Sequence, residues 1–310
     1  MMIITVTLNP ALDQQIMLDS FAPGTIQWYS QGIFLPGGKG VNVSRLLSSL
    51  GMENKALGIA AGFTGREILR LLEKEGCKTD FVLLEEGNSR INVKLRTAGG
   101  EETALNGTGP RIPEEAVDQL LEKLTGLTSE DVVVLSGSLP EGLPETAFPR
   151  ILEAARRAGV RLVVDMAGDS LLATLPYHPY LIKPNDQELR EIFSLEGPLT
   201  AQDVKEYAGQ LQRMGAKNVV VSLGAKGALL REESGRCMFC HGVRGRAVST
   251  VGAGDSLVAG FLYGLELHGT MEGALKWGVA AGAATAFQED LATGEQVKAR
   301  FPAVGNPHIL

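Results

Sequence analysis

Val132-Val133-Val134-Leu135 is a short, continuously apolar run of the kind that forms a strand buried on both faces. Three similar runs follow at Leu162-Val163-Val164-Asp165, Leu181-Ile182-Lys183 and Val219-Val220-Val221-Ser222, and Ile3-Ile4-Thr5-Val6-Thr7-Leu8 precedes them. Helix-like segments separate these runs, and strands that alternate with helices form a parallel sheet covered on both faces. The pattern predicts an α/β fold with a doubly wound, mostly parallel sheet that binds ligands at the carboxyl ends of its strands.

Two insertions depart from this alternation. Arg90-Ile91-Asn92-Val93-Lys94-Leu95-Arg96 alternates apolar and polar residues, which predicts a strand with one covered and one exposed face. Residues 14–34 lack helical periodicity and contain the turn Ala22-Pro23-Gly24. We expect the insertions at about 13–35 and 88–106 to form a small antiparallel sheet. Because so small a sheet is marginal alone, it should lie over a ligand as a lid or against another subunit.

The length of 310 residues fits one large α/β domain, and neither a repeat nor an interdomain linker interrupts residues 1–310. Lys39 to Leu50 has helical spacing, and Thr64-Gly65-Arg66-Glu67 has the pattern of a capping box that opens a helix ending near Glu75. The formal net charge of −7 argues against general affinity for nucleic acid. Anionic ligands must therefore be held by local groups.

The chain has three cysteines and no signal-peptide pattern, so we expect a cytoplasmic, reduced protein. The longest apolar stretch, around Trp277 to Phe287, is far shorter than the roughly 20 residues of a membrane span. Cys237-Met238-Phe239-Cys240-His241 matches the haem-attachment pattern. That chemistry belongs to exported proteins, and a structural zinc would need more ligands, so a strand of a hairpin is the simpler interpretation.

The most informative motif is Thr250-Val251-Gly252-Ala253-Gly254-Asp255-Ser256, which runs directly into the helical segment Leu257 to Leu265. Alternate glycines let backbone amides of Gly252-Ala253-Gly254 point at one anion, and the helix dipole adds positive potential there. Asp255 would lie at the mouth of this nest, where it could accept a proton from an attacking hydroxyl. A helix N-terminus should lower the pKa of that carboxylate. The alternative is a glycine-rich turn with an acidic cap.

A second glycine cluster, Leu35-Pro36-Gly37-Gly38-Lys39-Gly40-Val41-Asn42, also opens a helix. The adjacent glycines permit close contact with a sugar, while Lys39 and Asn42 offer a cation and an amide. It is not a phosphate-binding loop of the Walker A type, because Ile33 stands where that spacing requires glycine. An ordinary tight turn before a helix is the alternative.

Three further strand ends carry polar groups. Lys183-Pro184-Asn185-Asp186-Gln187-Glu188 combines a capping box with a cation, an amide and a carboxylate that suit nucleotide phosphates and Mg²⁺. Ser222-Leu223-Gly224-Ala225-Lys226-Gly227 could lie beside a nucleotide or simply turn a hairpin. Ser136-Gly137-Ser138-Leu139-Pro140 could present hydroxyls to a ligand.

These motifs occur in one order, together with Thr7-Leu8-Asn9-Pro10-Ala11-Leu12-Asp13. In that order the chain resembles the ribokinase-like (pfkB) carbohydrate kinases, in particular their sugar-phosphate kinase branch, over nearly its whole length. The resemblance implies an α/β sandwich with a β-sheet lid, Mg-ATP as phosphoryl donor, and a homodimer formed through the lid.

The resemblance also implies roles for individual residues. Asp255 is similar to the catalytic base of the family, and Gly252, Ala253 and Gly254 to its anion hole. The residues similar to those that bind the acceptor sugar phosphate in the family are Asp13, Gly37, Gly38, Lys39, Asn42, Arg90 and Ser138. Of these, Lys39 and Arg90 would bind its phosphate. The nucleotide side corresponds to Lys183, Asn185, Ser222, Gly224 and Gly227, and Glu188 to an indirect, water-mediated Mg²⁺ ligand.

The acceptor that the resemblance implies best is fructose 1-phosphate, phosphorylated at its 6-hydroxyl to give fructose 1,6-bisphosphate. The Gly38-Lys39-Gly40 sequence and the run 89–95 carry this interpretation. Tagatose 6-phosphate is the close alternative, and fructose 6-phosphate fits less well because the lid turn Gly24-Thr25-Ile26-Gln27 lacks basic residues. A non-catalytic sugar-phosphate sensor is a competing class, which an intact Asp255 disfavours. A dinucleotide-dependent dehydrogenase is another, although no G-x-G-x-x-G follows the first strand.

Overall fold

A computed structural model describes residues 1–310, with the exception of the side chain of Gln31. The central sheet contains the strands β1 (Ile3–Thr7), β4 (Asn54–Ala61), β5 (Val82–Leu84), β8 (Val132–Ser136), β9 (Arg161–Asp165), β10 (Leu181–Ile182), β11 (Asn218–Ser222), β12 (Gly227–Arg231), β13 (Cys237–His241) and β14 (His308–Ile309). Their order in space is β14-β13-β12-β11-β10-β9-β8-β1-β4-β5.

The sheet is parallel from β11 to β5, and the three strands β12, β13 and β14 extend it in antiparallel fashion. The predicted doubly wound, mostly parallel sheet is therefore confirmed. The chain builds outward from β1 to β4 and β5 and then returns to add β8 on the other side of β1. This reversal between β1 and β8 is the place where open α/β sheets bind their ligands.

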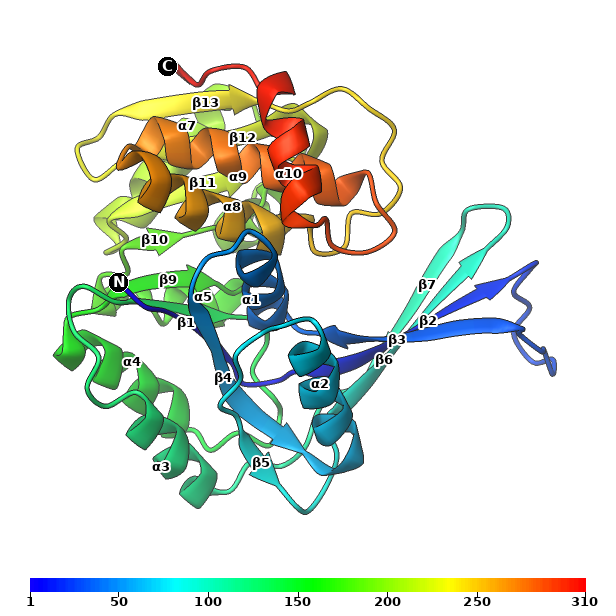
Figure 1. Ribbon diagram of the computed structural model, residues 1–310. Coiled ribbons are helices and arrows are strands. Elements are labelled where there is room, and N and C mark those ends of the chain that lie inside the picture. Colours follow the sequence, from blue (N-terminus) through cyan, green and yellow to red (C-terminus); the bar gives the residue numbers. More distant parts are fainter.

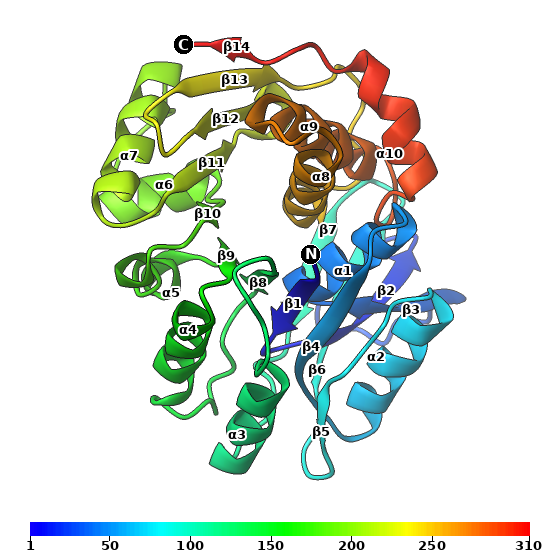
Figure 2. The same ribbon diagram turned by 60° about the vertical axis from the view of Figure 1, so that its left-hand side comes forward.

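Helices cover both faces of the sheet (Figures 1 and 2). One face packs against α1 (Lys39–Ser49), α8 (Ala253–His268), α9 (Met271–Ala286) and α10 (Gly294–Arg300). The other packs against α3 (Glu114–Lys123), α4 (Ala147–Ala158), α5 (Gly168–Leu172), α6 (Asp186–Phe193) and α7 (Ala201–Arg213). None of the helices in the described part of the chain combines the length and hydropathy needed to cross a membrane.

The first four residues of β8 are all apolar because both of its faces are covered by helices. Val132 and Val134 belong to the core beneath α1, α8 and α9, whereas Val133 and Leu135 belong to the core beneath α3 and α4. All four side chains are at most 2% exposed. Because successive side chains of a strand point to opposite faces, a strand between two helical layers must be apolar throughout.

A second, four-stranded sheet projects from the carboxyl edge of the central one and forms the lid (Figure 1). It contains β2 (Ala11–Leu18), β3 (Gln31–Gly37), β6 (Arg90–Thr97) and β7 (Glu102–Asn106), in the order β3-β2-β6-β7. The expectation of a wholly antiparallel lid is wrong, because β2 and β6 pair in parallel. Both strands leave the same edge of the central sheet and run outward from it, so they share one direction.

The helix α2 (Gly62–Lys74) begins three residues earlier than the predicted capping box requires. Thr64 lies inside this helix, and its hydroxyl donates to the carbonyl oxygen of Ser89 at 2.8 Å. The hydroxyl therefore anchors the chain that enters β6 and does not cap the helix.

The predicted strand at Cys237 to His241 is confirmed as β13, which forms a hairpin with β12. Cys237 and Cys240 are buried and pack in the two hydrophobic cores, and both thiols are free. These two cysteines therefore serve as small apolar core residues of the strand.

Candidate active site

Charged side chains from several elements meet at the carboxyl edge of the central sheet, near the reversal between β1 and β8. Asp13 lies in β2, shortly after the end of β1, while Asp165 ends β9 and Lys183 follows β10. Lys39 opens α1, and Asp255 lies in the first turn of α8. Elements far apart in sequence thus bring acidic and basic groups to one place.

Asp255 is 6% exposed and accepts a hydrogen bond from the Nδ2 of Asn42 at its Oδ2 (2.7 Å). Gly252, the residue that caps α8, has a φ of 76°, which an L-residue with a side chain rarely adopts. A Cβ at this position would also stand 2.6 Å from a methyl carbon of Leu291. Glycine is therefore required here to turn the chain into the helix and orient the carboxylate.

The pKa of Asp255 is raised to about 6, first by burial and then by the negative charge of Asp165. The hydrogen bond from Asn42 and the charges of Lys39 and Lys183 oppose this rise. The expected lowering of the pKa by the helix N-terminus is thus outweighed. A carboxylate with a pKa near neutrality is well matched to general base catalysis.

Asp165 is the buried centre of the charge network. Its Oδ1 lies 2.9 Å from the Nζ of Lys39 and 3.4 Å from the Nζ of Lys183. Although burial opposes ionisation, the two ammonium groups hold the pKa of Asp165 below its usual range. The Oδ2 of Asp165 is buried and has no partner within the described part of the chain. Asp165 therefore positions two cations beside Asp255.

Lys39, predicted to bind the acceptor phosphate, lies beside two carboxylates in this structure. Its Nζ is 2.9 Å from Asp165 and 3.7 Å from the Oε1 of Glu188. Although burial opposes the charged form, the carboxylates of Asp165, Glu188 and Asp255 raise the pKa of Lys39. The ammonium group is thus fully charged and faces the predicted nucleotide side.

The predicted anion hole consists of the first amides of α8. The amide of Ala253 donates a long bond of 3.3 Å to the carbonyl oxygen of Thr250. The amide of Gly254 has no acceptor among the described residues. A Cβ on Gly254 would stand only 3.3 Å from the Nζ of Lys183, so glycine lets this buried cation approach the nest. An anion at this point would meet both an amide and an ammonium group.

Glu188 and Asn185 form the predicted capping box of α6. The side chain of Asn185 accepts from the amide of Glu188 at 2.8 Å, and the Oε2 of Glu188 accepts from the amide of Asn185 at 2.9 Å. The Oε1 of Glu188 is left facing Lys39 at 3.7 Å. The capping role is thus real, and one carboxylate oxygen stays available for a second role.

The oxygen donors at this edge fit a magnesium ion that arrives with phosphates. No group of three or more His, Cys, Asp or Glu side chains could hold a metal within the described residues. Mg²⁺ usually keeps several waters and needs only one or two carboxylates besides phosphate oxygens. Glu188 Oε1 and the unpartnered Oδ2 of Asp165 meet this modest requirement.

The other predicted nucleotide residues follow β10 and β11. Asn185 and Ser222 form a parallel bridge, so these strand ends lie side by side. Gly224 opens a short turn, and open space surrounds its α-carbon. Gly227 has a φ of 110°, and a Cβ there would stand 2.0 Å from the carbonyl oxygen of Cys240. The β12–β13 hairpin alone accounts for this glycine.

Asp13 is held from three sides at the base of the lid. Its Oδ2 lies 2.6 Å from the Nζ of Lys94, and its Oδ1 accepts from the Nδ2 of Asn92 at 2.8 Å. A Cβ on Gly37 would stand 2.6 Å from the carboxylate carbon of Asp13. Gly38 has a φ of 117° and caps α1. The two predicted glycines therefore make room for Asp13 and for the turn into α1.

Arg90 and Ser138 both form hydrogen bonds with Asn9, which follows β1. The Nε of Arg90 donates to the carbonyl oxygen of Asn9 at 3.1 Å, and the exposed Ser138 accepts from the Nδ2 of Asn9 at 3.4 Å. Burial lowers the pKa of Arg90, and the charge of Asp13 opposes this change. No carboxylate forms an ion pair with Arg90 among the described residues, so its guanidinium is available to an anion.

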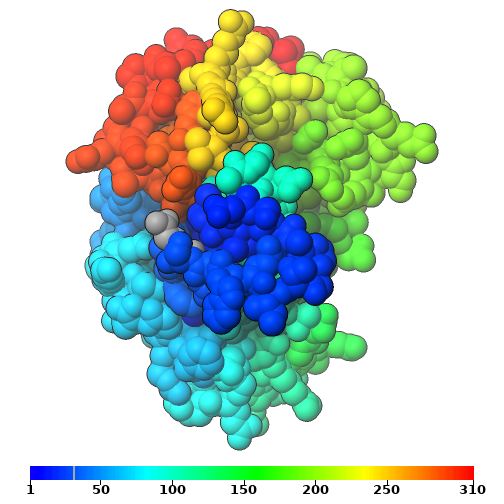
Figure 3. All heavy atoms as spheres, turned by 90° about the vertical axis from the view of Figure 1, so that its right-hand side faces the viewer, coloured from blue at the N-terminus to red at the C-terminus, as the bar shows by residue number. Residues whose placement is uncertain are grey.

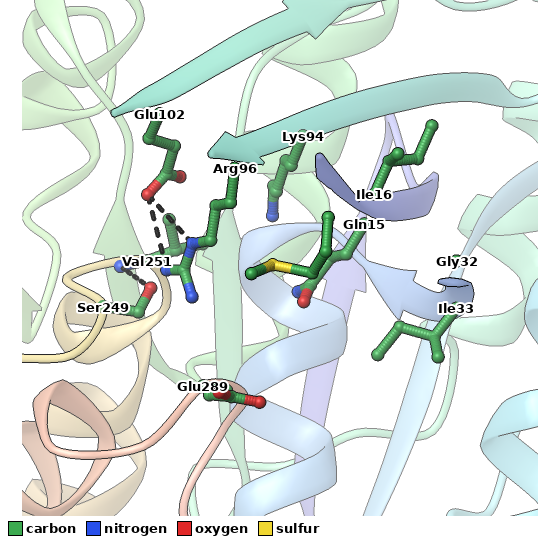
Figure 4. A pocket seen from close by; sticks show the side chains of 11 residues that line it. Gln15, Ile16, Gly32, Ile33, Lys94, Arg96, Glu102, Ser249, Val251 and Glu289 are labelled. Carbon is green, nitrogen blue, oxygen red and sulfur yellow. Dashed lines mark hydrogen bonds and ion pairs between the residues drawn. The ribbon is translucent and has the colours of Figure 1, made fainter. Parts of the chain in front are cut away.

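Two adjoining cavities lie between the lid and the main body. The inner cavity is lined by Asp13, Asn42, Lys94 and Gly252, together with residues 289–291. The outer cavity lies beneath the lid strands and is shown in Figure 4, where Lys94, Arg96 and Glu102 descend from the lid. The inner cavity has a volume of about 20 Å³. We call it the acceptor pocket, because Asp13 and Asn42, which the sequence predicts to contact the sugar, line it together with Gly252, the cap of the helix that carries Asp255.

Two charged residues of this site, Asp165 and Lys94, were not predicted from the sequence. Each had a visible signal. Asp165 ends an apolar strand, as ligand-binding residues of parallel sheets do. Lys94 shares the polar face of its alternating strand with Arg90 and Asn92. What the sequence could not indicate was the partner of each.

Comparison with known proteins gives one consistent result. Residues 8–297 match the model of the pfkB family carbohydrate kinases. The chain is 41% identical over 303 residues to a 1-phosphofructokinase of Bacillus subtilis, with 98% of each chain covered. It is 37% identical to a D-tagatose-1-phosphate kinase of Bacillus licheniformis, with 94% of each covered. The structure of phosphofructokinase-2 from Escherichia coli in complex with fructose-6-phosphate superposes with a TM-score of 0.89 at 31% identity, covering 97% of this chain and 98% of that one.

Proposed function

The chain belongs to the pfkB family of carbohydrate kinases, and from that premise we propose that it transfers a phosphoryl group from ATP to the 6-hydroxyl of fructose 1-phosphate. It is a sugar-phosphate kinase that uses ATP, and the sensor alternative is not favoured. The observation that carries the proposal is the position of Asp255. Its hydrogen-bond partner Asn42 lines the acceptor pocket, and the charges of Lys39 and Lys183 act on its carboxylate.

Proton removal is the task of Asp255 in this proposal. Its Oδ2 is held by Asn42, and its other oxygen has no partner among the described residues. That oxygen accepts the proton of the 6-hydroxyl while the hydroxyl oxygen attacks the γ-phosphorus and the bond to ADP breaks. The products are fructose 1,6-bisphosphate and ADP, and the proton leaves from Asp255 to solvent.

Charge stabilisation falls to the groups around Asp165. Phosphoryl transfer asks mainly for positioning and for cations placed where negative charge gathers. Positive charge comes from the ammonium groups of Lys39 and Lys183 and from the amide of Gly254. The nucleotide lies along Asn185, Ser222 and Gly224. Mg²⁺, when bound with the nucleotide near Glu188, supplies further positive charge to the phosphates.

On the acceptor side, Asp13 and Asn42 bind the sugar hydroxyls. Arg90 and Ser138 complete this side of the site. Relatives are named for both fructose and tagatose phosphates, so the acceptor must be measured directly. ADP release should be compared for fructose 1-phosphate, fructose 6-phosphate, tagatose 6-phosphate and tagatose 1-phosphate. We expect the highest kcat/KM for fructose 1-phosphate. A higher value for either tagatose phosphate would overturn the proposed acceptor.

The lid supports a proposal that two copies associate through it. Ile33 and Leu105 on this small sheet are 55% and 59% exposed, and Ile26 and Trp28 in the loop between β2 and β3 are 86% and 90% exposed. Figure 1 shows the lid projecting from the body, and Figure 3 looks onto it from its free end. Several large, exposed apolar side chains on one projecting element favour an interaction site there. Light scattering should therefore give twice the mass of one chain, and a monomeric mass would contradict the proposal.

Glu188→Gln provides a test of the proposed magnesium role. Gln can replace Glu in a capping box, so α6 should keep its start and thermal unfolding should change little. The charge facing Lys39 is lost, and we expect the Mg²⁺ concentration for half-maximal activity and for tight ATP binding to rise about tenfold or more. The KM for the sugar phosphate should stay within a factor of two.

The matched control is Glu191→Gln, an exposed position of the same helix that should change neither property. A lower unfolding temperature of Glu188→Gln with unchanged Mg²⁺ dependence would limit Glu188 to its capping role.

A further inference from the structure

Lys94 extends from β6 into the cavities between the lid and the main body. It lines both the acceptor pocket and the outer cavity, where Figure 4 shows it between Gln15 and Arg96. Its side chain is only 13% exposed, and its Nζ lies 2.6 Å from the Oδ2 of Asp13. A largely buried lysine in a ligand pocket needs a negative partner, and Asp13 provides one in this structure.

The acceptor pocket is otherwise unsuited to a dianionic sugar. The carboxylates of Asp13, Glu289 and Asp290 line it, and the only basic side chains among its described lining residues are Arg45 and Lys94. Arg45 is already occupied, because it pairs with Glu75 at 2.6 Å and Asp290 at 2.8 Å. Lys94 is therefore the cation that can offset the repulsion between these carboxylates and a phosphate.

The ion pair between Lys94 and Asp13 leaves room for a second partner. An ammonium group has three donors, and the bond to Asp13 uses one of them. Asp13 does not depend on Lys94 for its position, since Asn92 also donates to it and its carboxylate packs against Gly37. Lys94 can thus bind a new anion while Asp13 stays in place for the sugar hydroxyls.

We propose that Lys94 is a specificity-determining residue, whose ammonium group binds the phosphate already present on the acceptor and so selects a phosphorylated ketose over a neutral sugar. This inference rests on the proposed function and names the side chain that distinguishes a phosphorylated acceptor from a neutral one. Arg90 lines neither cavity, whereas Lys94 lines both. Lys94 therefore takes the place that the sequence suggested for Lys39 in the phosphate site.

Lys94→Gln tests this assignment. We expect the KM for fructose 1-phosphate to rise about 10-fold to 100-fold, as for other lost charge-assisted hydrogen bonds. The KM for ATP should stay within a factor of two, because Lys39 and Lys183 are untouched. In the wild type, sodium chloride should raise the KM for fructose 1-phosphate, and in the variant this dependence should be weaker. Lys94→Arg should restore part of the affinity.

Arg96→Gln is the matched control. Arg96 lies two residues further along the same face of β6, pairs with Glu102 at 3.3 Å and lines only the outer cavity. Its loss should change the KM for the sugar phosphate less than twofold.

Two results would overturn the assignment while leaving the proposed function intact. One is an unchanged KM in Lys94→Gln. The other is a raised KM with the salt dependence of the wild type and a lower unfolding temperature, which would mean that Lys94 only orders Asp13. A wild-type enzyme that releases no ADP with any of the ketose phosphates would contradict the proposed function and this inference together.

Discussion

Asp255→Asn should lower kcat by about 10²–10⁴ and leave the binding of both substrates nearly unchanged. The amide keeps the shape of the carboxylate and can still contact Asn42, but it cannot accept the proton of the acceptor hydroxyl. The anion hole and the lysines around Asp165 remain, so some phosphoryl transfer should persist. Initial rates of ADP release, together with calorimetric titration of fructose 1-phosphate, measure the two effects separately.

The matched control for this substitution is Glu266→Gln, at an exposed position near the other end of α8. It removes a carboxylate from the same helix and should leave kcat unchanged. Wild-type turnover in Asp255→Asn would show that Asp255 is not the base.

The pH dependence of kcat provides a second view of the same group. With a pKa raised to about 6, Asp255 loses its proton as the pH rises through 6, and only the ionised form can act as base. The wild-type kcat should therefore increase up to about pH 7 and then level off. Saturating substrate is necessary, because the phosphate of the acceptor itself has a pKa of about 6. The residual activity of Asp255→Asn should lack this rise.

The fold could be predicted from the sequence because its decisive signals are local. The strand at Val132 to Leu135 is apolar at every position, which occurs when helices cover both faces of a sheet. The glycine that caps α8 and the capping box at Asn185 and Glu188 were also readable, because backbone turns constrain residue types within a few positions.

The pairing of β2 with β6 could not be predicted in the same way. Residues 11–18 and 90–97 are separated by some seventy positions, and an alternating pattern indicates a strand without indicating the direction of its neighbour. The parallel pairing follows from where both strands leave the central sheet. That is a property of the assembled fold and not of either segment.

The roles of the site residues could be predicted from the sequence even less well than the pairing of the lid strands. The type of each charged residue shows that it could belong to a site, but its role depends on which partner the fold places beside it. Asp165 was visible only as the end of a strand, and the structure gives it two lysines. The pKa of Asp255 was expected to fall because of the helix terminus, and it rises because burial and Asp165 outweigh that effect. Such balances depend on distances that no motif contains.

Lys39→Met should lower kcat by about 10²–10³ and change the KM for fructose 1-phosphate little, because its ammonium group faces Asp165 and Glu188 and not the acceptor pocket. The sequence motif favours the opposite result, a raised KM for the sugar phosphate, since Lys39 follows the glycines that contact the sugar. Steady-state kinetics with each substrate varied in turn separates the two expectations.

The substitution also leaves Asp165 with Lys183 as its remaining cationic partner, and a buried carboxylate that loses a partner destabilises a protein. Thermal unfolding must therefore accompany the kinetics, and Lys39→Arg serves as the variant that keeps the charge. If Lys39→Arg retains stability and most of the acceptor affinity while kcat falls, the position of the cation limits the transfer step, since a guanidinium cannot place its charge where the ammonium lay. If both variants instead raise the KM for fructose 1-phosphate and leave kcat unchanged, Lys39 binds the acceptor and not the nucleotide phosphates. Asp165 would then act through Lys183 alone.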